Sequence, residues 1–157
     1  MKAENVNSFV QGAQNALSLI CGEPGKLGKV FIKQGTYHTL GNSVVIGFIG
    51  QLKGEAIYTM NDDCGLYLAS KVMMGRPVNS MDDIAKSAVS ELANIISGHA
   101  SIMLSKHEME VDILPPNFIE GQTSDKFSFI MPQDKVICMP LTLSTGMVLE
   151  MDLHLQG

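Results

Sequence analysis

Apolar residues recur at helical spacing in two long stretches of the chain. The first covers residues 3 to about 20 and ends at a Gly-Glu-Pro-Gly segment, residues 22–25, that stops a helix. The second runs from about Ser80 to about Lys106 and predicts the longest helix. A shorter helix is predicted from the cap at Asn61 to about Met74. The apolar positions of the longest helix, which we expect to face the core, are Ile84, Ala88, Leu92, Ile95, Ile96, Ile102 and Met103.

Short apolar runs bounded by Gly, Pro, Asn and Asp predict strands elsewhere. Lys53-Gly54 is a plausible tight turn that joins two of them as a hairpin. The segment from Asn117 to Asp125 reads as a loop. The expected strands are Lys29–Lys33, Ser43–Leu52, Glu55–Met60, Val111–Leu114, Lys126–Met131, Lys135–Leu143 and Met147–Leu155.

The chain contains a weak internal repeat. Val45, Ile49 and Gly54 of the first hairpin can be laid on Ile137, Leu141 and Gly146 at a constant offset of 92 residues. Each hairpin follows a helix with a Ser-x-x-x-?-x-x-Asn pattern. We therefore expect an α+β fold: two pseudo-symmetric helix-plus-hairpin halves that form one antiparallel-rich sheet, with the long central helix packed on it. The length of 157 residues suits a single domain, residues 1–157.

Composition narrows the function classes. The net charge of −5 and the absence of a basic cluster argue against nucleic-acid binding. No apolar run approaches the roughly 18 residues that a membrane span needs, and the N-terminus lacks a signal-peptide core. Cys21, Cys64 and Cys138 are widely spaced and odd in number, which favours buried thiols in a reducing, cytoplasmic compartment.

The familiar catalytic and nucleotide-binding motifs are absent from the sequence. The glycines at 47, 50 and 54 lack the Lys-Ser/Thr of a P-loop, and no GxSxG elbow marks a serine hydrolase. The four histidines show no HExxH or i, i+4 pairing, so the chain carries no metal signature of its own. His99 is better explained as a core histidine than as a ligand.

A polar arc on the long helix remains as the candidate site. Ser87, Glu91, Asn94 and Gly98 fall within roughly 60° of one another on a helix of 3.6 residues per turn. A plain solvated surface is the simpler explanation from periodicity alone. Asn and Gly, however, are costly helix residues, by roughly 0.5 and 1 kcal/mol relative to Ala, and Lys or Glu would make a cheaper exposed face.

The motif Ser87-x-x-x-Glu91-x-x-Asn94, followed by Gly98 and by Pro115-Pro116, resembles the signature of the CheC/CheX/FliY chemotaxis phosphatases. The family proline stands about 23 residues after the Asn, a slip of one or two residues here. The glycine-rich hairpin and the two-half layout also match, so the resemblance covers essentially the whole chain. CheC-like members usually carry two active pairs, whereas CheX-like members keep the second and are homodimers. Gly12 in place of Glu makes Asn15 an unlikely second site and brings the chain closer to CheX.

The resemblance implies a phosphatase that hydrolyses the aspartyl phosphate of a CheY-like response regulator. Asn94 would orient the attacking water, and Glu91 would contact the lysine of the receiver. Ser87 and Gly98 would bind the partner, with Gly98 allowing close approach. The receiver would supply Mg²⁺, and this chain would bind no cofactor. By analogy, Val111–Leu114 and the two prolines are candidates for the dimer interface. A docking module of the same fold that does not hydrolyse, or a flagellar-switch component, are the alternatives.

Overall fold

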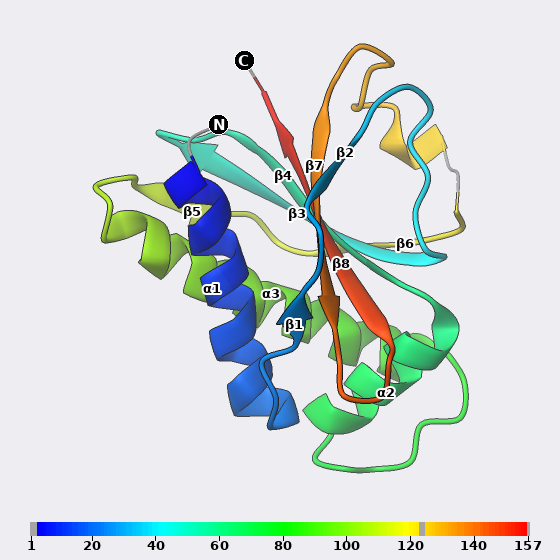
Figure 1. The fold of residues 1–157 in the computed structure, drawn as a ribbon. Coiled ribbons are helices and arrows are strands. Elements are labelled where there is room, and N and C mark those ends of the chain that lie inside the picture. Colours follow the sequence, from blue (N-terminus) through cyan, green and yellow to red (C-terminus); the bar gives the residue numbers. More distant parts are fainter. Residues whose placement is uncertain (1–2, 123–124, 157) are drawn as a thin grey trace.

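The computed structural model describes residues 3–122 and 125–156 of the chain (Figure 1). Three α-helices and one short 3-10 helix accompany a single eight-stranded sheet in the described residues. The helices are α1 (Ala3–Cys21), α2 (Asp62–Val72), α3 (Asp83–Ser105) and the 3-10 helix η1 (Asp125–Phe127). The strands are β1 (Lys26–Leu27), β2 (Phe31–Lys33), β3 (Asn42–Gly50), β4 (Gly54–Met60), β5 (Val111–Ile113), β6 (Asn117–Glu120), β7 (Val136–Thr142) and β8 (Val148–Leu155).

The sheet is built from two antiparallel hairpins, β3–β4 and β7–β8, that join where β4 pairs with β8. The strand order is β1-β7-β8-β4-β3-β5, with β2 also on β7 and β6 also on β3. The predicted α+β fold with two hairpins in one antiparallel sheet is therefore confirmed. The constant offset of 92 residues does not describe the pairing of the two hairpins. Val45 pairs with Ile57, so the offset would pair Ile137 with Leu149, but Ile137 pairs with Leu153.

Helices α1 and α3 pack against each other and on one face of the sheet, and α2 lies beside the first half of α3 (Figure 1). The side-chain oxygens of Asn61 and Asp82 accept hydrogen bonds from the backbone N–H groups of Cys64 and Ala85, both at 2.9 Å, and so begin α2 and α3. The predicted start of the long helix at Ser80 was therefore three residues too early.

Side chains on the two faces of the sheet belong to two separate cores because successive strand residues point to opposite sides. Ala56 and Tyr58 of β4 pack with the helices, whereas Ile57 packs with Phe127 and Ile130 on the opposite face. The second core is smaller, and the segment that contains η1 covers it.

Two predictions about this covering segment were wrong. Asn117–Glu120 is the strand β6 on the edge of β3, although it was expected to be a loop; residues 123 and 124 of that expected loop lie outside the described residues. Lys126–Met131 is not a strand but η1 followed by turns, with Phe127 and Ile130 buried. An apolar pattern this short does not distinguish a strand from a turn that inserts two side chains into a core.

Smaller differences concern edges and helix faces. The strand β1 was not predicted, and the strand expected from Lys29 begins at Phe31. Ile84 and Ile102 were expected in the core but are 64% and 55% exposed. The three cysteines are buried and unpaired, as expected. Among the described residues, no helix is both long enough and apolar enough to cross a membrane.

Candidate functional site

The four predicted site residues lie along the outer surface of α3. Ser87 and Glu91 are exposed, and Asn94 and Gly98 are half-buried, each one turn from the next. Ile84 precedes them and Ile102 follows them on the same surface. We call this surface, from Ile84 through Ser87, Glu91, Asn94 and Gly98 to Ile102, the α3 stripe. The structure thus brings together every residue that the sequence predicted for the site.

The buried side of α3 determines which way the stripe faces. Leu92, Ala93 and Ile96 are at most 2% exposed and fill the core between α3 and the sheet. Next to Gly98, the buried Ser97 shares a hydrogen bond of 2.7 Å with the hydroxyl of Tyr58 on β4. This contact joins the helix to the central hairpin of the sheet, and rotation of α3 would leave both hydroxyls buried without a partner. Ser97 therefore holds the rotation of α3 against the sheet, and the sequence analysis did not single it out.

The polar groups of the α3 stripe are available to a partner. Within the described part of the chain, the side chains of Glu91 and Asn94 have no hydrogen bond or ion pair. A Cβ atom built on Gly98 would meet no atom within 4 Å, so the glycine is not required by packing inside this chain. A carboxylate, and a carboxamide with both donor and acceptor atoms, therefore point to solvent beside an open stretch of helix backbone.

The corresponding motif on α1 does not form a similar site. Ser8 is buried, and its hydroxyl donates to the carbonyl of Glu4 at 2.8 Å. Gly12 is buried against the backbone of α3, and only Asn15 is exposed. The three residues do not share an exposed face, because α1 turns this part of its surface into the contact with α3.

A shallow groove adjoins the stripe between α2 and α3. It has a volume of about 500 Å³ and runs from the end of α2 to Glu91. Apolar and polar residues both line it: Val72, Met73, Asp83, Ile84, Ser87, Ala88 and Glu91. A partner that contacts Glu91 would therefore also meet an apolar wall.

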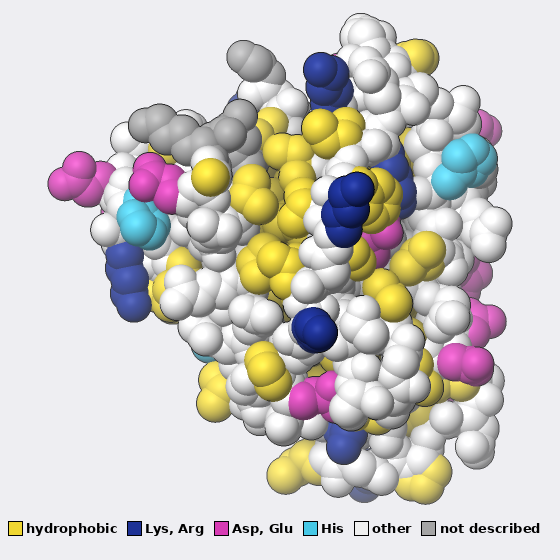
Figure 2. Space-filling view, viewed as in Figure 1, with side chains coloured by type: hydrophobic (Ala, Val, Ile, Leu, Met, Phe, Trp, Pro, Cys, Tyr) yellow, Lys and Arg dark blue, Asp and Glu magenta, His cyan; other side chains and the backbone are white. Residues whose placement is uncertain are grey.

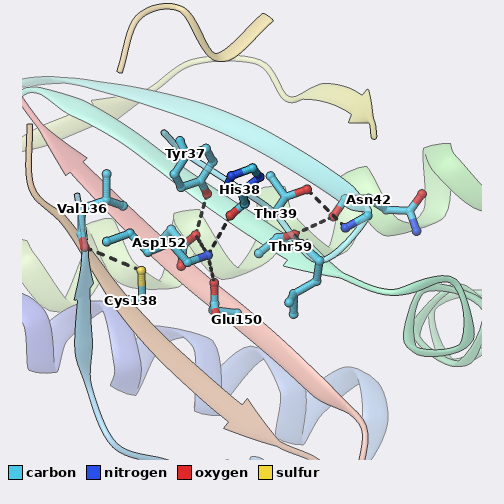
Figure 3. Close-up of polar contacts among 12 residues, drawn as sticks. Tyr37, His38, Thr39, Asn42, Thr59, Val136, Cys138, Glu150 and Asp152 are labelled. Atoms are coloured by element: carbon cyan, nitrogen blue, oxygen red, sulfur yellow. Dashed lines mark hydrogen bonds and ion pairs between the residues drawn. The ribbon is translucent and has the colours of Figure 1, made fainter. Parts of the chain in front are cut away.

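A second polar cluster lies on the opposite face of the sheet, and Figure 3 shows its centre. The Lys33 ammonium lies 2.6 Å from Glu150 Oε2 and 3.2 Å from Asp152 Oδ2, and it donates to the His38 carbonyl at 2.9 Å. The Tyr37 hydroxyl donates to Asp152 Oδ2 at 2.5 Å. The carboxylates are 5% and 0% exposed, so this is a buried ion-pair network.

Burial governs the protonation of this cluster. Burial and the neighbouring Glu150 carboxylate raise the pKa of Asp152 to about 7, although Lys33 and Tyr37 oppose the shift. Burial lowers the pKa of Lys33, but the Asp152 and Glu150 carboxylates outweigh it, so the pKa lies above its usual value. Burial also raises the pKa of the Cys138 thiol. The cluster therefore has a structural role, in which the Lys33 ammonium lies between the carboxylates of Glu150 and Asp152.

The sequence carried a signal for this cluster that was missed. Glu150, Asp152 and His154 alternate with Leu149, Met151 and Leu153 along β8, which reads as one solvent-facing side. All three polar residues are instead buried. Lys33 and Tyr37 contact Glu150 and Asp152. His154 bridges Glu55 and Asp134 at 2.7 and 2.8 Å. The polar positions of a solvent-facing strand are often Thr or Ser. Three ionisable residues in these positions could have indicated a network of ion pairs and hydrogen bonds.

The fold is that of the CheC-like proteins. A CheC-like superfamily protein from Shewanella sp. PV-4 superposes with a TM-score of 0.82 at 26% identity, and the match covers 100% of both chains. A CheX from Borrelia burgdorferi, solved with CheY, BeF₃ and Mg²⁺, superposes with a TM-score of 0.78 at 23% identity over 97% of each chain. The latter identity supports the fold alone.

The sequence comparisons define the family. Residues 42–126, more than half of the chain, match the family model of the chemotaxis phosphatase CheX. A relative from Thermotoga maritima, the CheY-P phosphatase CheX, is 28% identical over 155 residues, covering 99% of this chain and 96% of the relative. The chain belongs to the chemotaxis phosphatase CheX family, as the motif on α3 suggested.

Proposed function

We propose that this phosphatase-family chain removes the phosphoryl group from the aspartyl phosphate of a CheY-like receiver. The observation that carries the proposal is the α3 stripe, where Glu91 and Asn94 reach solvent without a partner in the described chain. The Thermotoga maritima relative is named a CheY-P phosphatase, and the Borrelia burgdorferi relative was solved with CheY, which supports the same substrate class.

Asn94 orients the attacking water in this proposal. Hydrolysis of an acyl phosphate needs a water molecule in line with the phosphorus and opposite the leaving carboxylate. The Asn94 carboxamide can accept a hydrogen bond from that water and donate to a phosphoryl oxygen, without itself changing protonation. Holding two reactants in this geometry can lower a barrier by several kcal/mol.

Glu91 fixes the position of the receiver along α3. One turn before Asn94 on α3, its carboxylate can form a charge-assisted hydrogen bond with the receiver lysine beside the phosphate. Gly98 lets the partner backbone approach α3, because its α-carbon faces open space. Ser87, one turn before Glu91, supplies a hydroxyl that can form a further hydrogen bond with the receiver.

We propose that Mg²⁺ is held by the receiver. In the described residues, the group of three possible ligands is Cys138, Glu150 and Asp152, which is buried on the sheet face away from α3. The Lys33 ammonium already lies against both of its carboxylates. The acidic groups of the receiver would hold the cation, which would supply positive charge at the phosphoryl group.

Replacing Asn94 tests the catalytic proposal. Wild type is expected to accelerate the decay of phosphorylated CheY from Thermotoga maritima, and Asn94→Ala is expected to give the decay rate of the receiver alone. Asn15→Ala is the matched control, because Asn15 is exposed at the corresponding place on α1. Equal decay with wild type and Asn94→Ala would contradict the enzyme proposal and would support the alternative, a docking module that does not hydrolyse.

We also propose a cytoplasmic homodimer formed by a single domain, residues 1–157. Hydrophobic side chains gather between α1 and β2 in Figure 2, and Leu27, Phe31 and Ile32 along the β1–β2 edge are 37–57% exposed. The resemblance favours the opposite edge, where Leu114 follows β5 and is 43% exposed. Light scattering measures the molar mass of Ile32→Lys and Leu114→Lys, and the substitution that gives a monomer identifies the edge that forms the dimer. A monomeric wild type would contradict the dimer.

A further inference from the structure

An almost fully exposed methionine with an unusual backbone conformation follows the end of helix α2. Met74 is 96% exposed and has a φ of +61°, and Gly75 follows with a φ of +89°. The backbone N–H groups of Met74 and Gly75 donate to the carbonyls of Lys71 and Ser70, which is the pattern of a Schellman helix end. Glycine or asparagine is usual at the position of Met74, because a side chain strains the left-handed backbone. Such strain often marks a functional position.

Met74 directly follows a residue that lines the groove beside the α3 stripe. Met73, the preceding residue, and Ile84, which is 64% exposed, both line that groove, and Glu91 lines it as well. Its remaining apolar wall comes from Val72 and Ala88. The apolar lining of the groove is therefore continuous with Glu91, one of the residues proposed to contact the receiver. We call Ile84, Met73 and the adjacent Met74 the corner.

A receiver engaged at Asn94 is large enough to cover the corner. Ile84 precedes Asn94 by ten residues, or about 15 Å along the axis of α3 at 1.5 Å per residue. A standard protein interface buries about 800 Å² on each partner, which is a disc of roughly 16 Å radius. A disc centred on Asn94 reaches Ile84 and the groove behind it.

We propose that Met74 and Ile84 form a second, apolar contact for the receiver, which rests on the proposed function of Asn94 and Glu91. The occupant is an apolar side chain on the receiver surface beside its phosphorylated aspartate. Burial of these two exposed side chains would add affinity, and the flexible thioether of Met74 can adapt to the shape of the partner. Glu91 and Asn94 would act on features common to phosphorylated receivers, and this corner would add a contact beyond them.

The test separates docking from chemistry. Met74→Gly and Ile84→Ser are expected to raise the KM for phosphorylated Thermotoga maritima CheY by about fivefold or more with kcat within about twofold. Met74→Gly is also expected to raise the midpoint of urea denaturation, because glycine relieves the strained backbone. That combination would not arise from a purely structural role. Met131→Ser is the control and is expected to keep the wild-type KM, because Met131 is a half-exposed methionine next to Ile130 of the second core.

Each other outcome has a defined meaning. Unchanged KM in both variants, with Asn94→Ala inactive, would overturn this inference and leave the proposed function intact. A wild-type protein that does not accelerate hydrolysis of the aspartyl phosphate would overturn the proposed function. Calorimetry would then measure the affinity of wild type and of the two variants for BeF₃-activated CheY. Equal affinities, or no binding at all, would overturn this inference too. A changed oligomeric state with unchanged KM would assign the corner to a second copy and also overturn it.

Discussion

Gly12 of α1 lies directly against the backbone of Ala100 on α3. A Cβ atom built on Gly12 would lie 2.5 Å from the Ala100 nitrogen and 2.7 Å from its α-carbon. The two helices are thus in backbone contact at the position where the first half of the chain departs from the motif of the second. The missing glutamate of α1 has a structural reason, since no side chain fits there.

Gly12→Ala should therefore destabilise the protein. Because the neighbouring atoms are backbone, the helices must separate, and we expect a loss of about 1–3 kcal/mol in the free energy of unfolding, measured by urea denaturation. Gly12→Glu should cost more, so a second active pair cannot be restored by completing the motif. Asn15→Ala serves as the exposed control. Wild-type stability in Gly12→Ala would show that the contact between α1 and α3 is looser than described.

Gly98→Ala should have the opposite effect on stability. Its Cβ would enter open space, and alanine favours the helix by about 1 kcal/mol over glycine, so the urea midpoint should rise. The same methyl group would stand between α3 and the receiver, so KM for phosphorylated CheY should rise. A more stable variant with unchanged KM would contradict the role of Gly98 in close approach.

Glu91→Gln should weaken the receiver complex without unfolding the chain. The side chain is exposed, so stability should stay within about 0.5 kcal/mol of wild type. Loss of a charge-assisted hydrogen bond, worth about 1.5–3 kcal/mol, predicts a fall of about 10- to 100-fold in kcat/KM and a weaker dependence on salt. Glu108→Gln, an exposed residue beyond the end of α3, is the control. Equal kcat/KM in wild type and Glu91→Gln would exclude the contact with the lysine.

Asp152→Asn should flatten the pH dependence of stability. The pKa of Asp152 is raised to about 7 from a reference of 3.8, so between about pH 4 and pH 7 the folded protein holds a proton that the unfolded chain releases. This carboxyl therefore makes the free energy of unfolding fall as pH rises through that window, with no further change above it. Urea midpoints across the window should show a smaller fall in Asp152→Asn than in wild type, whereas equal slopes would contradict the shifted pKa.

The sequence by itself determined the helices, the two hairpins and the polar positions of the candidate site. Helical and strand periods are local properties, and a Ser-x-x-x-Glu-x-x-Asn spacing places three side chains on one side of any helix. The residues Ser87, Glu91, Asn94 and Gly98 could therefore be named before the fold was known, and the family comparisons agree with the resemblance that the motif suggested.

Only the tertiary structure decided which surfaces are covered. The polar side of β8 is buried because Lys33 and Tyr37, which lie more than 110 residues earlier in the chain, contact Glu150 and Asp152. Phe127 and Ile130 fill the second core on the same face of the sheet. Ile84 and Ile102 are exposed because the tight contact at Gly12 and the Ser97–Tyr58 hydrogen bond fix the rotation of α3. Periodicity predicts that a helix or strand has two sides. Packing between remote segments selects the side that solvent reaches, and no local pattern contains that information.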